Sequence, residues 1–116
     1  LSEKELNSLF EKCHILISPS SYESFGLSNL EAMSYGIVVI ASNVGGVGEH
    51  ISNDINGKLI EFKSQKHLLE SIVKQIHDLI ENREKLNRIS LNAINYTIKK
   101  FKNNNFEKSY KDLLIE

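Results

Sequence analysis

The sequence of 116 residues predicts an α/β fold in which helices flank a parallel sheet. Two short apolar runs, residues 15–17 and 37–40, have the length and the β-branched composition of buried strands. Segments with helical periodicity lie before and between these runs, and such alternation is typical of parallel sheets. The second half of the chain, from residue 64 on, is dominated by helical periodicity.

The first helix and the first strand have clear boundary signals. Ser2 and Glu5 have the spacing of a capping box, which predicts a helix over residues 3–13. The strand at residues 15–17 is expected to be buried and to end before Pro19. Cys13, the one cysteine of the chain, continues the apolar stripe of the helix. We therefore expect a buried structural thiol rather than a nucleophile.

The next segments predict a helix over residues 27–35, with Gly36 as its C-terminal cap. The run at residues 37–40 is then expected to form a parallel strand that is buried on both faces. A loop over residues 42–48 follows.

Three short elements are expected before the long helices. These are a helical turn at residues 49–52, a tight turn at Asn56-Gly57 and an edge strand at residues 58–62.

Two long amphipathic helices are predicted in the second half, after caps at Ser64 and Asn82. Their apolar positions keep helical spacing, so both stripes are expected to face the core. The first stripe comprises Leu68, Leu69, Ile72, Val73, Ile76, Leu79 and Ile80, and the second comprises Leu86, Ile89, Ala93, Thr97 and Phe101. Asn103 to Asn105 form the clearest linker, before a final amphipathic helix that contains Phe106, Tyr110, Leu113 and Leu114.

Composition and charge narrow the function classes. The formal net charge is −1, with 41% hydrophobic and 25% charged residues, which fits one soluble globular domain. The apolar run at residues 37–41 is too short to span a bilayer, and residues 1–10 contain too many charges for a signal peptide. We therefore expect a cytoplasmic protein. The balanced charge argues against nucleic acid as a partner, and the four histidines lack the spacing of metal ligands.

A basic excess lies near the C-terminus. Residues 83–111 contain eight Lys or Arg residues and two acids. This excess is compatible with peripheral contact to a membrane of anionic lipid. A solvated helix face is the commoner explanation, and both readings stay open.

Glu23 and Glu31 bracket a segment that is the most informative part of the chain. If a strand precedes Glu23 and a helix begins near Gly26, Glu31 falls in the second turn, and both carboxylates flank a ligand at the helix N-terminus. Gly26 lets a ligand approach the backbone, and Phe25 and Leu27 would wall the site. The two carboxylates could accept hydrogen bonds from vicinal hydroxyls of a ligand, and the free N–H groups of the helix start could bind its anionic group. This combination predicts a nucleotide-sugar site. The alternative is that both glutamates are solvated surface charges.

These residues carry a family resemblance. The string from Pro19 to Gly36, PSSYESFGLSNLEAMSYG, resembles the E-x7-E region of retaining GT-B glycosyltransferases of the group 1 type. Residues 45–49, GGVGE, and then Asn56-Gly57 resemble that family's G-G-x-x-E and N-G segments in the same order. The E-x7-E motif is specific for this family here, because it lies in the expected order of strand, glycine turn, helix, glycine and strand.

The resemblance implies a Rossmann-like parallel sheet with flanking helices, as the C-terminal portion of a GT-B donor-binding domain. The whole chain, residues 1–116, would be a partial nucleotide-sugar-binding domain, with an α/β motif region at 1–62 and C-terminal helices at 63–116. The implied enzyme is hexosyltransferase-like and serves polysaccharide biosynthesis, without a cofactor or a metal. It transfers a sugar from a nucleoside diphosphate sugar to a glycan or lipid-linked acceptor with retention.

The resemblance also assigns roles to individual residues. Glu23 would be catalytic, in contact with the transferred sugar near the reacting centre, and Glu31 would hold the ribose hydroxyls. The implied donor-binding residues are Ser24, Phe25, Gly26, Leu27 and Glu31, with Gly45, Gly46 and Glu49 as further candidates.

Two positions depart from the family pattern, which often has Asp where Asn43 stands and Pro where Gly48 stands. The basic pair that neutralises the donor diphosphate in this family would precede Leu1. No Lys or Arg occurs between Lys12 and Lys58, which leaves His50 as the candidate cation there.

We therefore expect an incomplete active site that lacks the N-terminal acceptor domain, and an isolated chain without transfer activity. A second function class stays open, namely a non-catalytic sugar-nucleotide or protein-binding module of the same fold.

Overall fold

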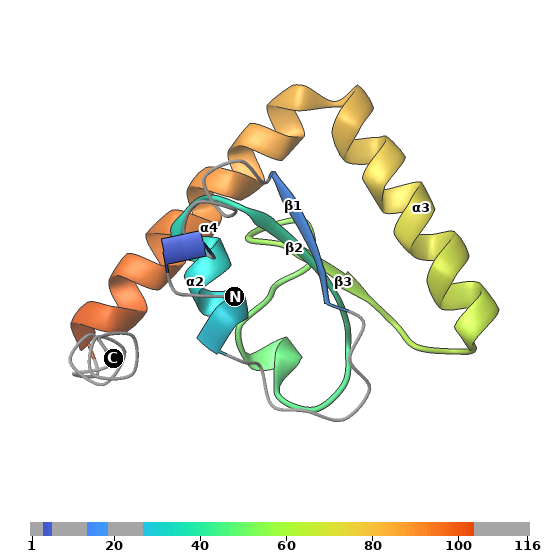
Figure 1. The fold of residues 1–116 in the computed structure, drawn as a ribbon, viewed down its shortest axis with the longest axis horizontal. Coiled ribbons are helices and arrows are strands. Elements are labelled where there is room, and N and C mark those ends of the chain that lie inside the picture. The colour runs from blue at the N-terminus through green and yellow to red at the C-terminus, as the bar shows by residue number, and fades with distance from the viewer. Residues whose placement is uncertain (1–3, 6–13, 19–26, 104–116) are drawn as a thin grey trace.

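The described residues of the computed structural model are 4–5, 14–18 and 27–103. They form a three-stranded parallel sheet with helices on both faces (Figure 1). The elements in chain order are β1 (Ile15–Ser18), α2 (Leu27–Ser34), β2 (Val38–Ser42), the 3₁₀ helix η1 (Val47–Glu49), β3 (Lys58–Ile60), α3 (Gln65–Glu81) and α4 (Arg83–Asn103). None of the described helices combines the length and the apolarity needed to cross a membrane.

Strand β2 lies in the centre of the described sheet, in the order β1-β2-β3. Its register pairs Ile15 with Val38 on one side and Ile40 with Lys58 on the other, and both pairings are parallel. All five residues of β2 are buried. The prediction of a parallel strand buried on both faces is therefore confirmed.

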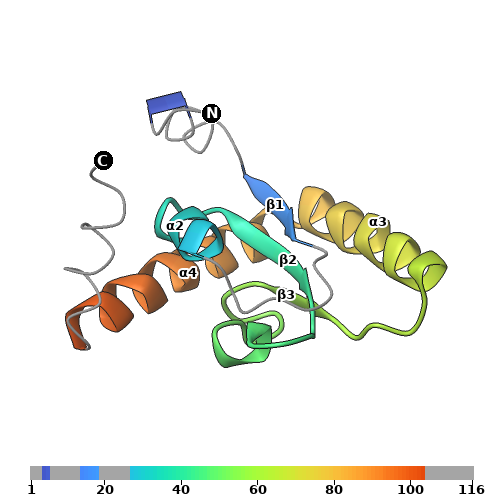
Figure 2. The ribbon, with the colours of Figure 1, turned by 60° about the horizontal axis from the view of Figure 1, so that its bottom comes forward.

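Alternate residues of β2 face two separate cores, since successive side chains of a strand point to opposite faces. Val39 and Ala41 pack with α2 in one core, and Val38 and Ile40 pack with α3 in the other. Helix α4 contributes Ala93 to the first core and Ile89 to the second. Figure 2 shows α2 and α3 on opposite sides of the sheet, with α4 passing beneath α2.

Gly36 ends α2 as the sequence predicts. Its φ of 81° is left-handed, and the amides of Gly36 and Ile37 donate to Met33 and Ala32 at 3.0 and 3.1 Å in a Schellman motif. A Cβ at this position would lie 2.7 Å from the hydroxyl of Ser90. Glycine is thus required both by backbone conformation and by the close approach of α4.

Both predicted helix caps are confirmed. The Ser64 hydroxyl accepts from the amide of His67 at 3.1 Å at the start of α3. The Asn82 side chain accepts from the amide of Lys85 at 3.1 Å at the start of α4.

The expected core face of α3 is wrong for three of its residues. Leu68, Ile72 and Leu79 are buried as predicted, whereas Leu69, Val73 and Ile80 are 55% to 63% exposed. Neighbouring residues of a helix point about 100° apart, so the sheet covers only one of the two adjacent apolar rows. The predicted core positions of α4 are buried from Leu86 to Thr97, and the side chain of Phe101 lies outside the described residues.

Other boundaries also need correction. Strand β1 is only partly buried, with Ile17 41% exposed. The short helical turn covers Val47–Glu49 rather than residues 49–52. Asn103 is the last residue of α4 rather than part of a linker, and β3 ends at Ile60. The helix expected at residues 3–13, Cys13 within it, and the one expected after residue 105 lie mostly or wholly outside the described residues.

The tight turn before β3 is built differently from the prediction. The turn covers residues 54–56, and Asp54 takes the left-handed conformation, with φ 65°. Asn56 is buried, and its side chain accepts from the amide of Ser52 at 2.8 Å and donates to the carbonyl of His50 at 2.9 Å. A buried amide that satisfies two backbone groups thus fixes this loop.

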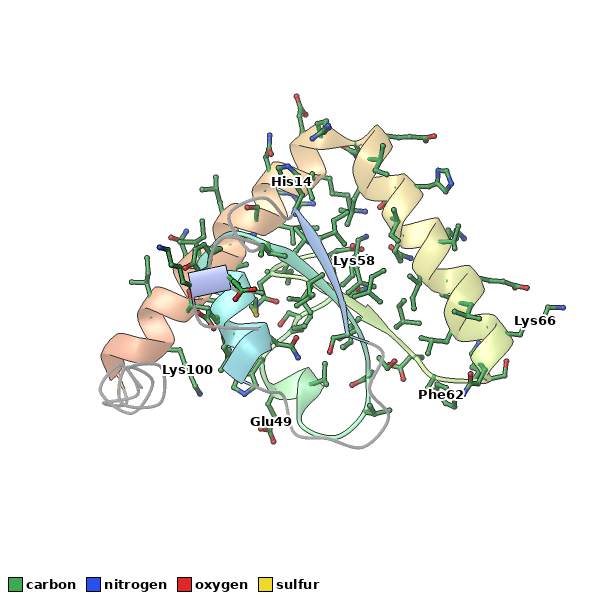
Figure 3. The ribbon with its side chains drawn as sticks, viewed as in Figure 1. His14, Glu49, Lys58, Phe62, Lys66 and Lys100 are labelled. Atoms are coloured by element: carbon green, nitrogen blue, oxygen red, sulfur yellow. The ribbon has the colours of Figure 1, made fainter. Side chains whose placement is uncertain are left out.

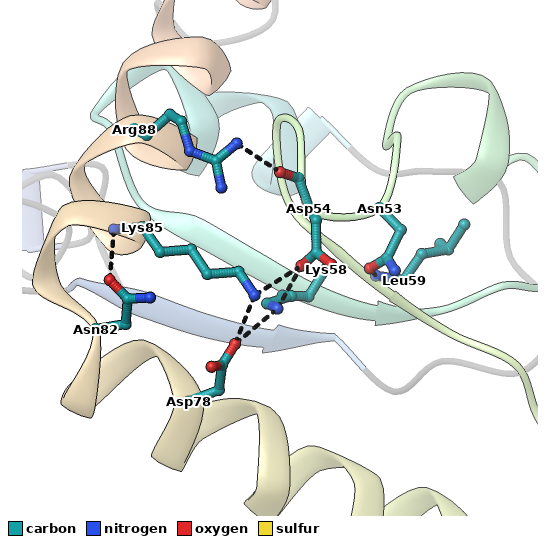
Figure 4. A network of polar contacts seen from close by, with 8 residues as sticks. All are labelled: Asn53, Asp54, Lys58, Leu59, Asp78, Asn82, Lys85 and Arg88. Carbon is teal, nitrogen blue, oxygen red and sulfur yellow. Dashed lines mark hydrogen bonds and ion pairs between the residues drawn. The ribbon is translucent and has the colours of Figure 1, made fainter.

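An ion-pair network joins β3 to the helical hairpin of α3 and α4 (Figure 4). Lys58 is only 2% exposed, and its Nζ pairs with Asp54 and, at 3.2 Å, with Asp78. The Nζ of Lys85 lies 2.8 Å from Asp78 and 3.6 Å from Asp54. Hydrogen bonds from these lysines lower the pKa of both aspartates. Arg88 donates to the Asp54 carbonyl at 3.3 Å, so part of the basic excess after residue 83 has a structural role.

We expect Gly36→Ala to destabilise the fold more than Gly45→Ala, as measured by urea unfolding. Both positions are left-handed, with φ 81° and 58°, and each alanine would carry strain of about 1 to 2 kcal/mol. Gly45 is exposed and so isolates the conformational strain, whereas alanine at position 36 would also press on Ser90. Equal losses in the two variants would show that α4 does not require glycine here.

Candidate functional site

The carboxyl ends of β1 and β2 lie at the same edge of the sheet, since the two strands are parallel. Helix α2 and the loop that follows β2 both start at this edge (Figure 1). The side chain of Asn29, in the first turn of α2, donates to the Ser18 hydroxyl at the end of β1 at 3.2 Å. This edge is where open α/β sheets bind their ligands.

Glu31 is in the second turn of α2, as the sequence predicts. The residue is only 5% exposed, so the alternative of a solvated surface charge is wrong. Its backbone carbonyl accepts from the Ser34 hydroxyl at 2.6 Å, which tightens the end of the helix. Burial of a carboxylate is costly unless the carboxylate accepts hydrogen bonds. The Glu31 carboxylate is therefore expected to accept hydrogen bonds from groups inside the domain or from a ligand, rather than from bulk water.

The remaining residues of the E-x7-E frame are only partly described. Glu23, Ser24, Phe25 and Gly26 lie outside the described residues, and their roles stay predictions. Leu27 is the first described residue of α2, and a helix start near Gly26 stays a prediction.

The loop after β2 carries the glycine segment. Gly45 is exposed and left-handed, with φ 58°, whereas Val47 is buried and anchors the loop in the core. The amide of Glu49 donates to the Gly46 carbonyl at 3.1 Å, and its side chain is exposed. Gly45, Gly46 and Glu49 are thus together on one short turn at the carboxyl edge.

The two departures from the family pattern are structurally connected. The side chain of Asn43 donates to the carboxylate of Glu61 at 2.6 Å. An aspartate at position 43 would place two carboxylates against each other. A Cβ on Gly48 would lie 3.1 Å from the Asn43 side-chain oxygen, so a small residue suits that position. The loop is therefore tied to the residue after β3 by a contact that asparagine allows.

His50 has a partner that sequence reasoning missed. Its Nδ1 lies 2.7 Å from the hydroxyl of Tyr96 in α4. Burial and the positive charge of Lys100 lower the pKa of His50, against a smaller opposite effect of Glu49. Figure 3 labels Glu49 and Lys100, which lie at the same end of the molecule. The lowered pKa favours the neutral imidazole at neutral pH over the charged form that would pair with a diphosphate.

No group of three or more His, Cys, Asp or Glu residues suited to a metal ion occurs in the described part of the chain.

The chain is similar to known glycosyltransferases in sequence. The family model described as "Glycosyl transferases group 1" matches residues 1–96. D-inositol 3-phosphate glycosyltransferase from Paenarthrobacter aurescens is 34% identical over 86 residues, which cover 74% of this chain and 21% of that protein. The matched segments span only 20% to 21% of the length of three curated relatives.

Solved structures share the fold. The C-terminal domain of a glycosyl transferase group 1 family protein (LpcC) from Francisella tularensis is 32% identical, with a TM-score of 0.73 over 84% of this chain and 48% of that chain. Anabaena Alr3699/HepE, solved in complex with UDP-glucose, is 26% identical, with a TM-score of 0.75 over 95% of this chain and 29% of that chain.

The lowered pKa of His50 predicts a pH-dependent stability. Between the pKa in the folded state and about 6.5, the unfolded chain binds more protons than the folded chain. The free energy of unfolding is therefore expected to fall as the pH drops from about 7.5 to about 5.5. His50→Asn, which keeps an amide near the Nδ1 position, should have a smaller pH dependence in urea unfolding. Identical pH dependence in the parent and the variant would contradict this assignment.

Proposed function

This chain belongs to the glycosyl transferases group 1 family and has the fold of a GT-B C-terminal domain, and from this we propose that it binds the donor for a retaining sugar transfer. The proposed donor is a nucleoside diphosphate sugar. The observation that carries the proposal is the burial of Glu31 in α2, a helix that starts at the carboxyl edge of the sheet, as does the glycine loop after β2. A relative with the same fold, Anabaena HepE, was solved in complex with UDP-glucose, which supports this donor class.

Each candidate residue has a physical role in this proposal. The Glu31 carboxylate accepts hydrogen bonds from the ribose hydroxyls. Amides at residues 25–27, the helix start that the sequence predicts, contact the sugar or the diphosphate, because a helix N-terminus favours negative charge. Glu23 contacts the transferred sugar, and the turn with Gly45, Gly46 and Glu49 closes the donor site from the other side.

The proposed reaction moves the sugar to a hydroxyl group of a glycan or a lipid-linked acceptor, with retention at the anomeric carbon. The bond from that carbon to the diphosphate breaks, and the nucleoside diphosphate leaves with the electron pair. The acceptor oxygen forms the new glycosidic bond, and its proton passes to the departing diphosphate. Charge on the leaving group needs preorganised cations or dipoles. Between residues 27 and 57 the chain offers helix amides but no Lys or Arg, so we infer that residues 1–116 alone bind the donor without turnover.

The role of Glu31 is testable by donor binding. Glu31→Gln keeps the size and one acceptor oxygen but removes the charge, so nucleotide binding should weaken about 10- to 100-fold, or roughly 1.5 to 3 kcal/mol. Titration calorimetry with UDP-, GDP- and ADP-glucose, with and without a chelator, measures this affinity. The donor that binds should do so equally well in the presence of the chelator.

Glu70→Gln is the matched control, since Glu70 is an exposed residue of α3, which packs on the other face of the sheet. This substitution should leave the affinity unchanged and alter stability by no more than about 0.5 kcal/mol. Equal affinity of the parent and Glu31→Gln, with both folded by circular dichroism, would remove Glu31 from the site. Failure of the parent to bind any of the donors would overturn the proposed function.

A further inference from the structure

His50 and Tyr96 connect the loop at the candidate site to α4, a helix from much later in the chain. The His50 Nδ1 and the Tyr96 hydroxyl are 2.7 Å apart, and the two rings meet edge-on at 79° with centroids 6.1 Å apart. The two residues are 46 positions apart in the sequence. Their contact therefore exists only when the loop and α4 are both in place.

The backbone of His50 is held on both sides. Its amide donates to the Val47 carbonyl at 3.1 Å, at the end of η1. Its carbonyl accepts from the side chain of the buried Asn56 at 2.9 Å. Because these bonds restrict the backbone, a fixed position of the imidazole also fixes the end of the glycine turn.

Tyr96 is attached to a well-packed part of α4. Its neighbours Ala93 and Thr97 are buried, and Tyr96 itself packs against the core that contains Leu30 and Met33 of α2. The same surface of α4 thus supports α2, which carries Glu31, and shares a hydrogen bond with His50 at the end of the glycine loop.

We propose that His50 and Tyr96 are positioning residues, whose hydrogen bond sets the location of residues 45–49 relative to α2 and thereby the affinity for the donor. The expected effect on donor affinity rests on the proposed function. The expected effect on the position of the loop does not. In this arrangement α4 is the common support for both donor-binding segments.

The charges around the pair are consistent with a neutral hydrogen bond. Burial and Lys100 lower the pKa of His50, whereas burial and Glu49 raise the pKa of Tyr96. At neutral pH an uncharged imidazole thus meets an uncharged phenol.

Tyr96→Phe tests the proposal because it removes only the hydroxyl. In ¹H–¹⁵N NMR spectra of the chain without ligand, the amides of Gly45, Gly46 and Gly48 should shift. Gly36, which contacts α4 through Ser90 and Ile94, reports whether α4 still packs normally. Thr97→Val is the matched control, since it removes the neighbouring hydroxyl of α4, which bonds within the helix to Ile94 at 2.8 Å. This control should leave the loop glycines unchanged.

Donor binding gives the second readout, with UDP-glucose as the probe. Loss of one neutral hydrogen bond should weaken the affinity of Tyr96→Phe about 2- to 10-fold, and Thr97→Val should bind as the parent does. In a His50→Leu background, Tyr96→Phe should cause no further loss, because the bond is already absent.

Unchanged loop glycines in Tyr96→Phe, or additive losses in the double variant, would overturn the positioning role. If the parent binds none of the sugar nucleotides, the proposed function fails. The shifts of the loop glycines would still decide whether the hydrogen bond positions the loop.

Discussion

The burial of β2 on both faces is the constraint on which the rest of this structure depends. A strand of five buried residues can be stable only if apolar elements cover both sides of it. Helix α2 supplies one side and α3 the other, while α4 contributes to both cores. The parallel pairing of β1 and β2 then brings the carboxyl end of β1 and the glycine loop after β2 to the same edge. The location of the candidate site is thus a consequence of how the core is covered.

Polar contacts between distant segments fix the positions of loops that the hydrophobic core alone does not hold. Asn43 ties the beginning of the glycine loop to Glu61 after β3, and His50 ties its end to Tyr96 in α4. The buried Lys58 connects β3 with both long helices through Asp54 and Asp78. Asn43, Lys58 and Glu61 occupy positions where hydrophobic patterning predicts only a loop or an edge strand. The tie through Lys58 is specific because a buried polar group needs a partner in a defined direction.

Sequence reasoning succeeded where the signal is local. The buried character of residues 37–40, the cap at Gly36 and the caps at Ser64 and Asn82 each follow from a few neighbouring residues. It failed where the partner is distant. Periodicity alone could not decide which of two adjacent apolar rows of α3 meets the sheet, so Leu69, Val73 and Ile80 were assigned to the core. Tyr96 carried no signal as a partner of His50, since the two are far apart in the sequence. The predicted position of Glu31 in the second turn of its helix agrees with the structure, because it follows from helical spacing and one glycine.

The central claim is that a sugar nucleotide binds at the carboxyl ends of β1 and β2. Its most direct test is addition of UDP-glucose, GDP-glucose or ADP-glucose to the ¹⁵N-labelled chain, followed by the amide spectrum. For the donor that binds, the largest changes are expected in the first two turns of α2 and in residues 45–49. Amides around Asp78 and Lys85, which lie at the junction of α3 and α4, should remain unchanged. Changes centred on that junction, or on α3, would contradict the claim.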